Sequence, residues 1–349
     1  MSIAVFAGVA AVMSAFLAHW LSKPSSPFYV LDHPNDRSLH SEPTPRTGGI
    51  AIVTTIVAIG AALAFYQGQY SYRLLPIIVA MTVVAAMSLA DDLCRVHASV
   101  RFISHVAAAA LIISAGFVVD NTWMPGTYAG LAPALTNAAT LVFIVWMVEL
   151  YNFMDGIDGL AGGMSVIGFG TMSILALVAG QHLLAGLVAV IASAALGFLA
   201  LNFPPARIFM GDVGSATLGL LAAAFSLWGS QSGAFPLWAA VLIFSPFIVD
   251  ATVTLLRRAL RRERVWEAHR THYYQRLIQA GWSHRKVVLW EYTLMLMASA
   301  SALWGVPQSD HAQWILLSLW AFAYAVLAWA VARKIAARRD LPLRAQYAK

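Results

Sequence analysis

The amino-acid sequence predicts an all-α, polytopic integral membrane protein with about eleven transmembrane helices. Hydrophobic residues make up 60% of the 349 residues and charged residues only 11%, whereas soluble domains carry about 25% charged residues. The mean hydropathy is +0.72, and apolar runs of about 18 or more residues recur along the chain. These observations exclude a soluble globular domain, a disordered chain and a fibrous protein.

The apolar runs define the predicted helices in order. No Lys or Arg precedes the first run, so it lacks the basic start of a secretory signal and is expected to be a retained membrane helix. Two segments fit a full span least well, because 160–179 begins in a glycine cluster and 214–228 is short. The predicted helices cover residues 2–21, 48–66, 74–90, 101–119, 131–151, 160–179, 182–202, 214–228, 234–256, 287–304 and 312–332.

The basic residues predict the orientation. Of the 22 Lys and Arg residues, 21 follow odd-numbered helices or lie in the C-terminal tail, and Arg73 is the exception. Since Lys and Arg concentrate on the cytoplasmic side, we expect the N-terminus outside and the C-terminus in the cytoplasm. A single transmembrane domain, 1–349, then has cytosolic loops at 22–47, 91–100, 152–159, 203–213 and 257–286 and a basic cytoplasmic tail at 333–349.

Most acidic residues fall in the same predicted cytosolic connections, while the external ones contain only Asp120 and Asp310. We therefore expect the function at the cytosolic face. Asp91 and Asp92 end an apolar helix, where their charge opposes the helix dipole, so capping does not explain them. Paired carboxylates can hold a hard cation or poise a base; the alternative is the solvated start of a loop.

Two further motifs contain acidic and glycine residues. Residues 152–160 read Asn-Phe-Met-Asp-Gly-Ile-Asp-Gly-Leu, which predicts a tight turn whose aspartates can bind a metal or sugar hydroxyls; a plain interhelical turn is the alternative. Residues 209–215 read Phe-Met-Gly-Asp-Val-Gly-Ser. Asp212 therefore opens a helix, either as its cap or as a metal ligand where phosphate is also favoured.

The segment 257–286 is rich in Arg and His. Its guanidinium groups can grip phosphates through a planar fork of donors, or the segment can contact anionic lipid headgroups. Asp250 is an ionisable residue inside a predicted span, which marks a functional site by default; an ion pair with a nearby arginine is the alternative. Because the topology brings all these groups to one leaflet, the sequence predicts a site for magnesium and phosphate.

The same motifs resemble the polyprenyl-phosphate N-acetylhexosamine-1-phosphate transferase superfamily (glycosyltransferase family 4). The similarity runs from about Asp32 to Arg285 and includes the first-loop segments 32–40 and 45–49. The helix number and external N-terminus match the O-antigen-initiating branch. This sequence departs from the family at Glu149, where Asn is usual, and at Tyr274 and Gln275, which replace histidines of a His-x-His-His motif. The departures resemble a sub-branch that uses UDP-FucNAc or UDP-QuiNAc.

The resemblance implies an enzyme that transfers a UDP-linked N-acetylhexosamine 1-phosphate, of FucNAc, QuiNAc or GlcNAc type, to undecaprenyl phosphate. The products are the undecaprenyl-diphospho-sugar and UMP, as the first membrane step of O-antigen, lipopolysaccharide or related cell-wall glycan synthesis. It implies a multi-pass protein of the bacterial inner membrane with a cytosolic active site. Mg²⁺ is the expected cofactor, with Mn²⁺ as a substitute. The bilayer is a partner, nucleic acid is not, and a homodimer is expected by analogy.

The resemblance also assigns roles to individual residues. Asp212 and Asp92 are the expected metal ligands. The catalytic residues are expected to be Asp91, Asp92 and His272. The residues expected to bind the substrates are Arg46, Arg101, Asn152, Asp155, Asp158, His269, Arg270 and Arg276.

Three other functions are alternatives. One is a lipid-linked glycosyltransferase with an external acidic loop, for which Asp120 and Asp310 are too sparse. A secondary membrane transporter would use Glu149 and Asp250 as its coupling site, although transporters usually place such groups near the midplane between internal repeats, and no repeat is visible. A CDP-alcohol phosphotransferase would need an Asp-Gly-x-x-Ala-Arg core, which 155–160 lacks.

Overall fold

The computed structural model describes residues 2–34, 42–68, 73–94, 96–120, 123–127, 132–264 and 269–347, with side chains as far as residue 335. Within these residues the chain forms thirteen helices and two short strands. The helices are α1 (Ile3–Leu21), α2 (Gly48–Tyr66), α3 (Leu74–Cys94), α4 (Ala98–Ser114), α5 (Pro133–Met154), α6 (Leu160–Val178), α7 (His182–Asn202), α8 (Gly211–Gln231), α9 (Leu237–Ile243), α10 (Ser245–Leu260), α11 (Tyr273–Gln279), α12 (His284–Gly305) and α13 (Asp310–Tyr347).

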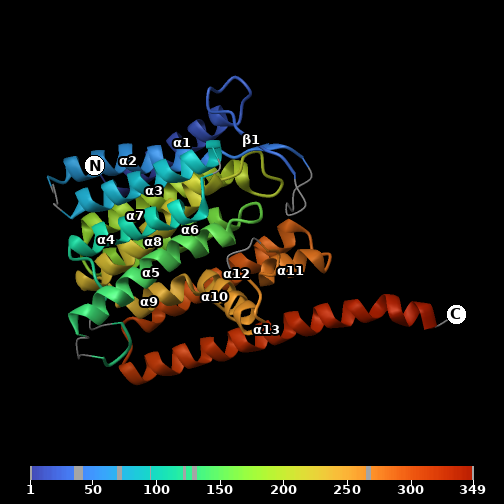
Figure 1. Ribbon diagram of the computed structural model, residues 1–349. Coiled ribbons are helices and arrows are strands. Elements are labelled where there is room, and N and C mark those ends of the chain that lie inside the picture. The colour runs from blue at the N-terminus through green and yellow to red at the C-terminus, as the bar shows by residue number, and fades with distance from the viewer. Residues whose placement is uncertain are drawn as a thin grey trace.

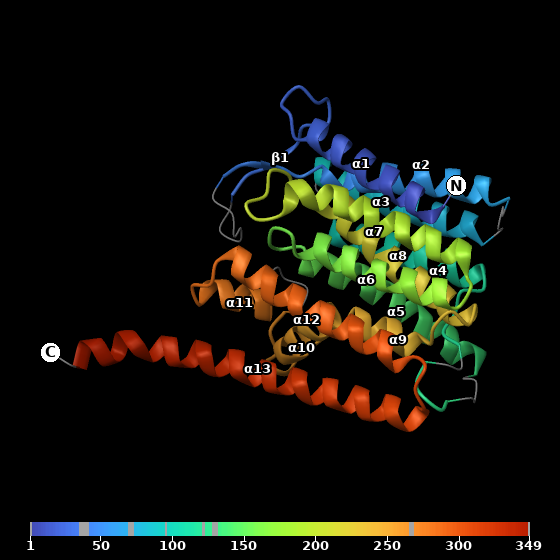
Figure 2. The same ribbon diagram turned by 180° about the vertical axis from the view of Figure 1, so that it is seen from behind.

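The long helices lie side by side in one bundle whose axes run in roughly the same direction (Figures 1 and 2). Helix α8 forms its centre: every residue in its most apolar stretch is buried, although this stretch is the least hydrophobic of the membrane-length helices together with that of α12. Helix α13 is the opposite case, with only 6% of its apolar stretch buried. The side chains of this apolar stretch are therefore left to contact lipid, where apolar groups need no protein partner.

Ten of the eleven apolar segments predicted from the sequence each correspond to one helix, and the protein is an all-α polytopic membrane protein. Among the described residues, nine helices are long and apolar enough to cross a membrane, and α9 with α10 makes a tenth span if the bent pair is counted as one. Helix α4 is shorter, with 17 residues. Two boundaries shift toward the site: α3 continues through Asp91 and Asp92 to Cys94, and α8 begins at Gly211.

The prediction of one helix over 234–256 was wrong. This segment contains α9 and α10, which meet at Phe244 with a bend of 77°. Pro246 occupies the first turn of α10, where its missing N–H costs no hydrogen bond. The Ser245 hydroxyl donates to the Leu242 carbonyl at 2.7 Å and so satisfies an end of α9.

Parts of three predicted loops form helices or strands. The loop 91–100 is reduced to the residues between Cys94 and Ala98, and 257–286 contains α11. In the first loop, β1 (Leu31–Asp32) pairs antiparallel with β2 (Thr44–Pro45); the motif residues 35–40 lie outside the described part of the chain. The predicted tail 333–349 continues α13 as far as Tyr347.

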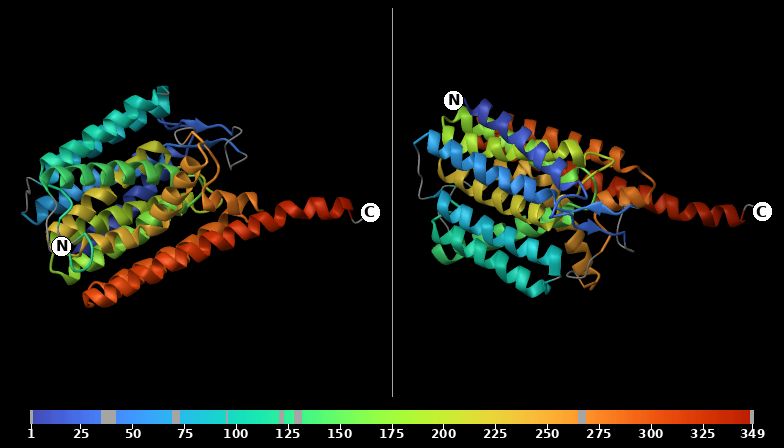
Figure 3. Two further views of the ribbon diagram at one scale, coloured as in Figure 1. Left: turned by 60° about the horizontal axis from the view of Figure 1, so that its bottom comes forward. Right: turned by 90° about the horizontal axis from the view of Figure 1, so that it is seen from above.

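The predicted cytosolic connections gather at one end of the bundle. Figure 1 shows the β1 region, the α5–α6 and α7–α8 connections, α11 and the C-terminus at this end, with the N-terminus at the other. Arg73, the one basic residue predicted to be external, stacks on Phe117 in the α4–α5 connection at the N-terminal end. Figure 3 shows α13 leaving the bundle and extending beyond the end that carries the motifs.

Candidate functional site

The first loop and the connection before α8 build the floor of the site through backbone hydrogen bonds. The amides of Gly48 and Gly49 donate to the carbonyls of Phe209 and Met210 at 2.9 and 2.7 Å. Gly211 has a φ of +68°, and a Cβ there would lie 2.2 Å from the Arg46 carbonyl oxygen. Only glycine fits such a close approach, so this sequence brings Arg46 beside Asp212.

Arg46 pairs with Asp92. Its guanidinium donates to the Asp92 carbonyl and lies 3.5 Å from the Asp92 carboxylate. The Asp92 side chain is 8% exposed and also interacts electrostatically with Asp91, Asp212 and Asp32. Asp92 is therefore a buried carboxylate that one arginine holds at the edge of a larger acidic cluster.

Arg101 joins the paired aspartates of α3 to the aspartate of α8. Its Nη1 donates to the Asp91 carboxylate and, at 3.3 Å, to Oδ2 of Asp212. The other oxygen of Asp91 accepts from the Val96 amide at 2.7 Å, which fixes the turn between α3 and α4. The Asp212 side chain is 32% exposed, so of the carboxylates that Arg46 and Arg101 contact it is the most open to a ligand.

The end of α5 adds a third side to the cluster. The Asn152 side chain lies near enough to Asp212 to interact with its carboxylate, and it donates to Ser215 Oγ at 3.5 Å. Burial raises the pKa of Asp155 well above its ordinary value, and the charges of Asp212, Asp158 and Asp92 raise it further. These carboxylates therefore share a region in which negative charge is not fully balanced.

Asp158 has the opposite environment. Burial favours its neutral form, but the nearby His284 and a hydrogen bond from the Ala206 amide outweigh that, so the pKa of Asp158 is lowered. The Ala206 amide donates to Oδ2 at 3.0 Å, and His284 Nδ1 lies 3.9 Å from the same oxygen. Asp158 is thus an ionised carboxylate that ties the α5–α6 turn to the connection before α8 and to the start of α12.

The residues predicted in the histidine segment surround α11. His272 is the N-cap of this helix; it is 2% exposed, its Nδ1 lies 3.3 Å from Asp250, and its ring stacks on Phe153. Burial, then the neighbouring His272 and Arg258, lower the pKa of His269 to about 4.

The basic members of this segment lie around the same helix. The guanidinium groups of Arg257 and Arg276 stack on the Tyr273 ring. The carbonyl of Arg270 accepts from the Gln279 side chain at 2.8 Å. His284, at the start of α12, brings the segment within 3.9 Å of the Asp158 carboxylate in the α5–α6 turn.

The structure therefore brings the predicted residues together in two groups. The first is the acidic cluster with its two arginines: Arg46, Asp91, Asp92, Arg101, Asn152, Asp155, Asp158 and Asp212. The second group lies on and around α11: His269, Arg270, His272 and Arg276.

A magnesium ion fits the acidic cluster only as a partly protein-bound ion. Among the described side chains, no group of three His, Cys, Asp or Glu residues is arranged to enclose a metal. Magnesium, however, is usually held by one or two carboxylates, with water and substrate phosphates completing the octahedron. Asp212 and Asp92 would be its carboxylate ligands, and the charges of both act on Asp155 in the same cluster.

Several residues that organise the site escaped the sequence analysis. The buried Asn202 side chain accepts from the Gly159 amide and donates to the Ile208 carbonyl, both at 2.9 Å, and so joins two motifs. The sequence signal for Asn202 is a polar residue at the end of an apolar run, next to the motif-bearing connection before α8. Tyr274, noted only as a departure from the family, donates to the Phe153 carbonyl at 2.9 Å.

Glu149 and Asp250, the residues of the transporter alternative, do not meet. Glu149 pairs with His105 Nδ1 at 2.8 Å, while Asp250 contacts the start of α11. The predicted ion pair between Asp250 and a nearby arginine is replaced by contacts with backbone amides and His272.

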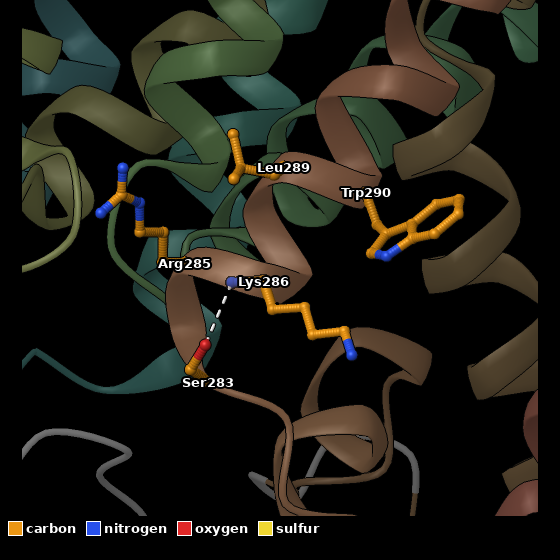
Figure 4. A pocket seen from close by; sticks show the side chains of 5 residues that line it. All are labelled: Ser283, Arg285, Lys286, Leu289 and Trp290. Carbon is orange, nitrogen blue, oxygen red and sulfur yellow. Dashed lines mark hydrogen bonds between the residues drawn. The ribbon is translucent and has the colours of Figure 1, made fainter.

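A cavity of about 300 Å³ lies at the start of α12, beside the acidic cluster but not within it. Its lining residues are Ser283, Arg285, Lys286, Leu289 and Trp290. Figure 4 shows Arg285 and Lys286 turned in different directions and the Ser283 hydroxyl capping the Lys286 amide. The cavity therefore does not present one convergent anion site.

Comparison with known proteins identifies the group to which the chain belongs. Residues 74–230 match the family Glycosyl transferase family 4. The chain is 33% identical over 276 residues to the probable undecaprenyl-phosphate N-acetylglucosaminyl 1-phosphate transferase of Bacillus subtilis (strain 168). The aligned region covers 78% of this chain and 76% of that protein.

More distant relatives are similar over most of their length. The decaprenyl-phosphate N-acetylglucosaminephosphotransferase of Mycobacterium tuberculosis (strain CDC 1551 / Oshkosh) is 29% identical over 335 residues, 87% of this chain and 83% of that protein. The phospho-N-acetylmuramoyl-pentapeptide-transferase of Staphylococcus aureus (strain MSSA476) is 28% identical over 282 residues, 75% and 84% respectively. With its motifs and their clustering, the chain belongs to glycosyl transferase family 4, the polyprenyl-phosphate N-acetylhexosamine-1-phosphate transferase superfamily.

Proposed function

We propose that this protein transfers an N-acetylhexosamine 1-phosphate from a UDP-sugar to a polyprenyl phosphate, undecaprenyl phosphate in a bacterial inner membrane. An oxygen of the lipid phosphate forms a bond to the sugar-bearing phosphorus of the UDP-sugar. The bond from this phosphorus to the oxygen that bridges the two phosphates breaks, and that oxygen leaves as part of UMP. The observation that carries the proposal is the Arg101 bridge between Asp91 and Asp212, with Arg46 on Asp92. The Arg101 bridge joins α3, α4 and α8 at the end of the bundle that also carries the motif 152–159.

The physical difficulty of this reaction is that both reactants are anionic. Two unit charges 4 Å apart repel by about 1 kcal/mol in water and by about 4 kcal/mol at an effective dielectric constant of 20. Arg46 and Arg101 are already at the cluster and can turn donors toward phosphate oxygens. A bound Mg²⁺, for which Mn²⁺ can substitute, would neutralise phosphate oxygens and stabilise the charge of the transferring group.

The remaining residues have separate tasks in this proposal. Asp91 and Asp92 orient the lipid phosphate, which already ionises near pH 6 and so needs no strong base. Asn152, Asp155 and Asp158 line the pocket for the nucleotide sugar. His269, Arg270 and Arg276 contact its diphosphate or sugar. His272, whose Nδ1 faces Asp250 in a buried setting, acts by orienting its neighbours.

The orientation, the sugar and the assembly complete the proposal. The charge distribution supports a cytosolic site, since 21 of the 22 Lys and Arg residues follow odd-numbered predicted helices or lie in the C-terminal tail. The relatives named for N-acetylglucosamine support GlcNAc, and the replacements Tyr274 and Gln275 support FucNAc or QuiNAc. The role in O-antigen synthesis and the homodimer stay predictions.

A reconstituted assay tests the function. Purified protein in vesicles with undecaprenyl phosphate and Mg²⁺ is given UDP-GlcNAc, UDP-FucNAc or UDP-QuiNAc, and UMP release is followed. We expect release with at least one sugar, dependent on the lipid phosphate, abolished by EDTA and restored by Mg²⁺ or Mn²⁺. Folded protein that releases no UMP with any of these sugars would refute the proposal, and release that persists in EDTA would refute the metal.

A further inference from the structure

Asp250 is a buried carboxylate that holds the start of α11. Its Oδ1 accepts from the Tyr273 amide at 2.9 Å and from the Thr254 hydroxyl at 3.2 Å, and its Oδ2 accepts from the Tyr274 amide at 3.2 Å. His272 Nδ1 lies 3.3 Å from Oδ1. The carboxylate thus takes up the first amides of α11, which have no partner inside the helix itself.

The short helix α11 depends on such contacts. It has seven residues, and an isolated helix of two turns is unstable because its nucleation cost exceeds the few hydrogen bonds that it gains. Its own capping box pairs His272 with Gln275. The carboxylate of Asp250 adds charge-assisted hydrogen bonds, which are stronger than neutral ones, and they fix α11 to α10.

Tyr274, the second residue of α11, contacts the motif 152–159. Tyr274 is fully buried, and its hydroxyl donates to the carbonyl of Phe153, the second-last residue of α5, at 2.9 Å. A Cβ on Gly156 would lie 2.0 Å from the same hydroxyl oxygen. The Tyr274 hydroxyl therefore lies directly against the turn that carries Asp155.

We propose that Asp250 is a positioning residue for the nucleotide-sugar side of the site. Through α11 it places Tyr274 against the end of α5 and so fixes the turn that carries Asp155 and Asp158. The inference rests on the proposed function for its kinetic part only. It predicts that loss of the Asp250 carboxylate loosens a turn with which Asp250 itself has no described hydrogen bond.

A pair of substitutions and their combination tests this. Asp250→Asn turns one acceptor into a donor that faces a backbone N–H, and Tyr274→Phe removes only the hydroxyl. In the full-length protein in detergent, we expect Asp250→Asn to increase amide hydrogen exchange in both 269–279 and 152–159. Tyr274→Phe is expected to increase exchange mainly in 152–159.

The kinetic arm separates positioning from general destabilisation. Since misplacement by about 1 Å can cost 10²-fold, we expect Asp250→Asn to reduce kcat/KM for the UDP-sugar by about 10- to 100-fold. The KM for the polyprenyl phosphate should stay within about twofold, because the Arg46–Asp92 pair is untouched. The double variant should lose little more than Asp250→Asn alone, since both act through the same contact.

Ser245→Ala is the matched control, because it removes a buried hydroxyl contact in α10, at 2.6 Å to Tyr324, away from α11. It should leave both readouts unchanged. Unchanged exchange in 152–159, equal losses for both substrates, or independent effects of the two substitutions would overturn the inference. If Asp250→Asn does not fold, Tyr274→Phe decides through exchange in 152–159. A wild type without UMP release would reject the function but leave the exchange test intact.

Discussion

Asp212 contacts side chains from two other helices, Arg101 of α4 and Asn152 of α5. These neighbours restrict the position of its short side chain at the start of α8. The same arrangement leaves a third of the side chain exposed, as a ligand for a substrate-bound metal must be.

Replacing this carboxylate by an amide tests its role. We expect Asp212→Asn, and likewise Asp92→Asn, to reduce turnover by about 100-fold or more, the scale of losing one strong electrostatic contact in a preorganised site. The measurement is UMP release at saturating substrates. Asp120→Asn, at the opposite end of the bundle, is the control and should keep wild-type turnover. Near-normal turnover of Asp212→Asn would contradict its assignment as a metal ligand.

His269 gives a prediction about pH. Burial and the neighbouring His272 and Arg258 lower its pKa from 6.5 to about 4, so the unfolded chain takes up a proton between these values while the folded protein does not. The stability contributed by neutral His269 is therefore complete above pH 6.5 and is lost as the pH falls toward 4.

We expect the melting temperature in detergent to fall less between pH 7 and pH 4.5 in His269→Gln than in the wild type. Between pH 7 and 8.5 the two proteins should show the same pH dependence, because His269 is neutral in both states. A steeper loss in the variant would show that protonated His269 is stabilised by the fold.

At the scale of elements, the close packing of α8 against α5 limits the size of the side chains that α8 can carry at the contact. A Cβ on Gly219 would lie 2.4 Å from the Met147 carbonyl oxygen of α5, and backbone cannot yield as a side-chain end can. We expect Gly219→Ala to destabilise the protein by about 1–3 kcal/mol, the usual cost of overpacking, measured as a lower melting temperature in detergent.

Gly170→Ala in α6 provides the matched comparison, because a Cβ there meets nothing within 4 Å. This variant should melt at or above the wild-type temperature, since alanine also favours a helix over glycine. Equal losses in the two variants would mean that the glycines act through the helix backbone rather than through the contact between α5 and α8.

For the whole molecule, the single cysteine reports the orientation. Cys94 is exposed and lies two residues after Asp92 in the last turn of α3. If the site faces the cytosol, a membrane-impermeant maleimide should label Cys94 in inside-out vesicles and not in right-side-out vesicles. In a Cys94→Ser background, Ser309→Cys, just before α13, should show the reverse. Labelling of Cys94 from the outside would place the site on the external face.

Much of this architecture was predictable because membrane insertion is decided over short windows of sequence. Burying about 20 apolar residues in lipid depends on their composition alone, so the segments 48–66 and 182–202 were predicted to the residue. The break at Phe244 was not, because 234–256 is apolar enough for one span and its bend depends on how Pro246 starts a second helix.

The members of the acidic cluster were predictable, but their partners were not. Motifs indicated Asp91, Asp92, Asp155, Asp158 and Asp212, and the charge asymmetry predicted one shared end. The sequence does not reveal that Arg101 rather than an arginine of 257–286 bridges Asp91 and Asp212. It also left Asp250 between a coupling site and an arginine pair, and the structure replaced both with the anchoring of α11.

The sequence by itself determined the class of protein, the positions of its spans, the family and the residues able to handle phosphate, since hydropathy and motif chemistry are local properties of the chain. Only the tertiary structure decided which charges face one another and which polar groups serve as supports. Those choices depend on the rotation and spacing of helices that are far apart in sequence, and no single segment carries that information.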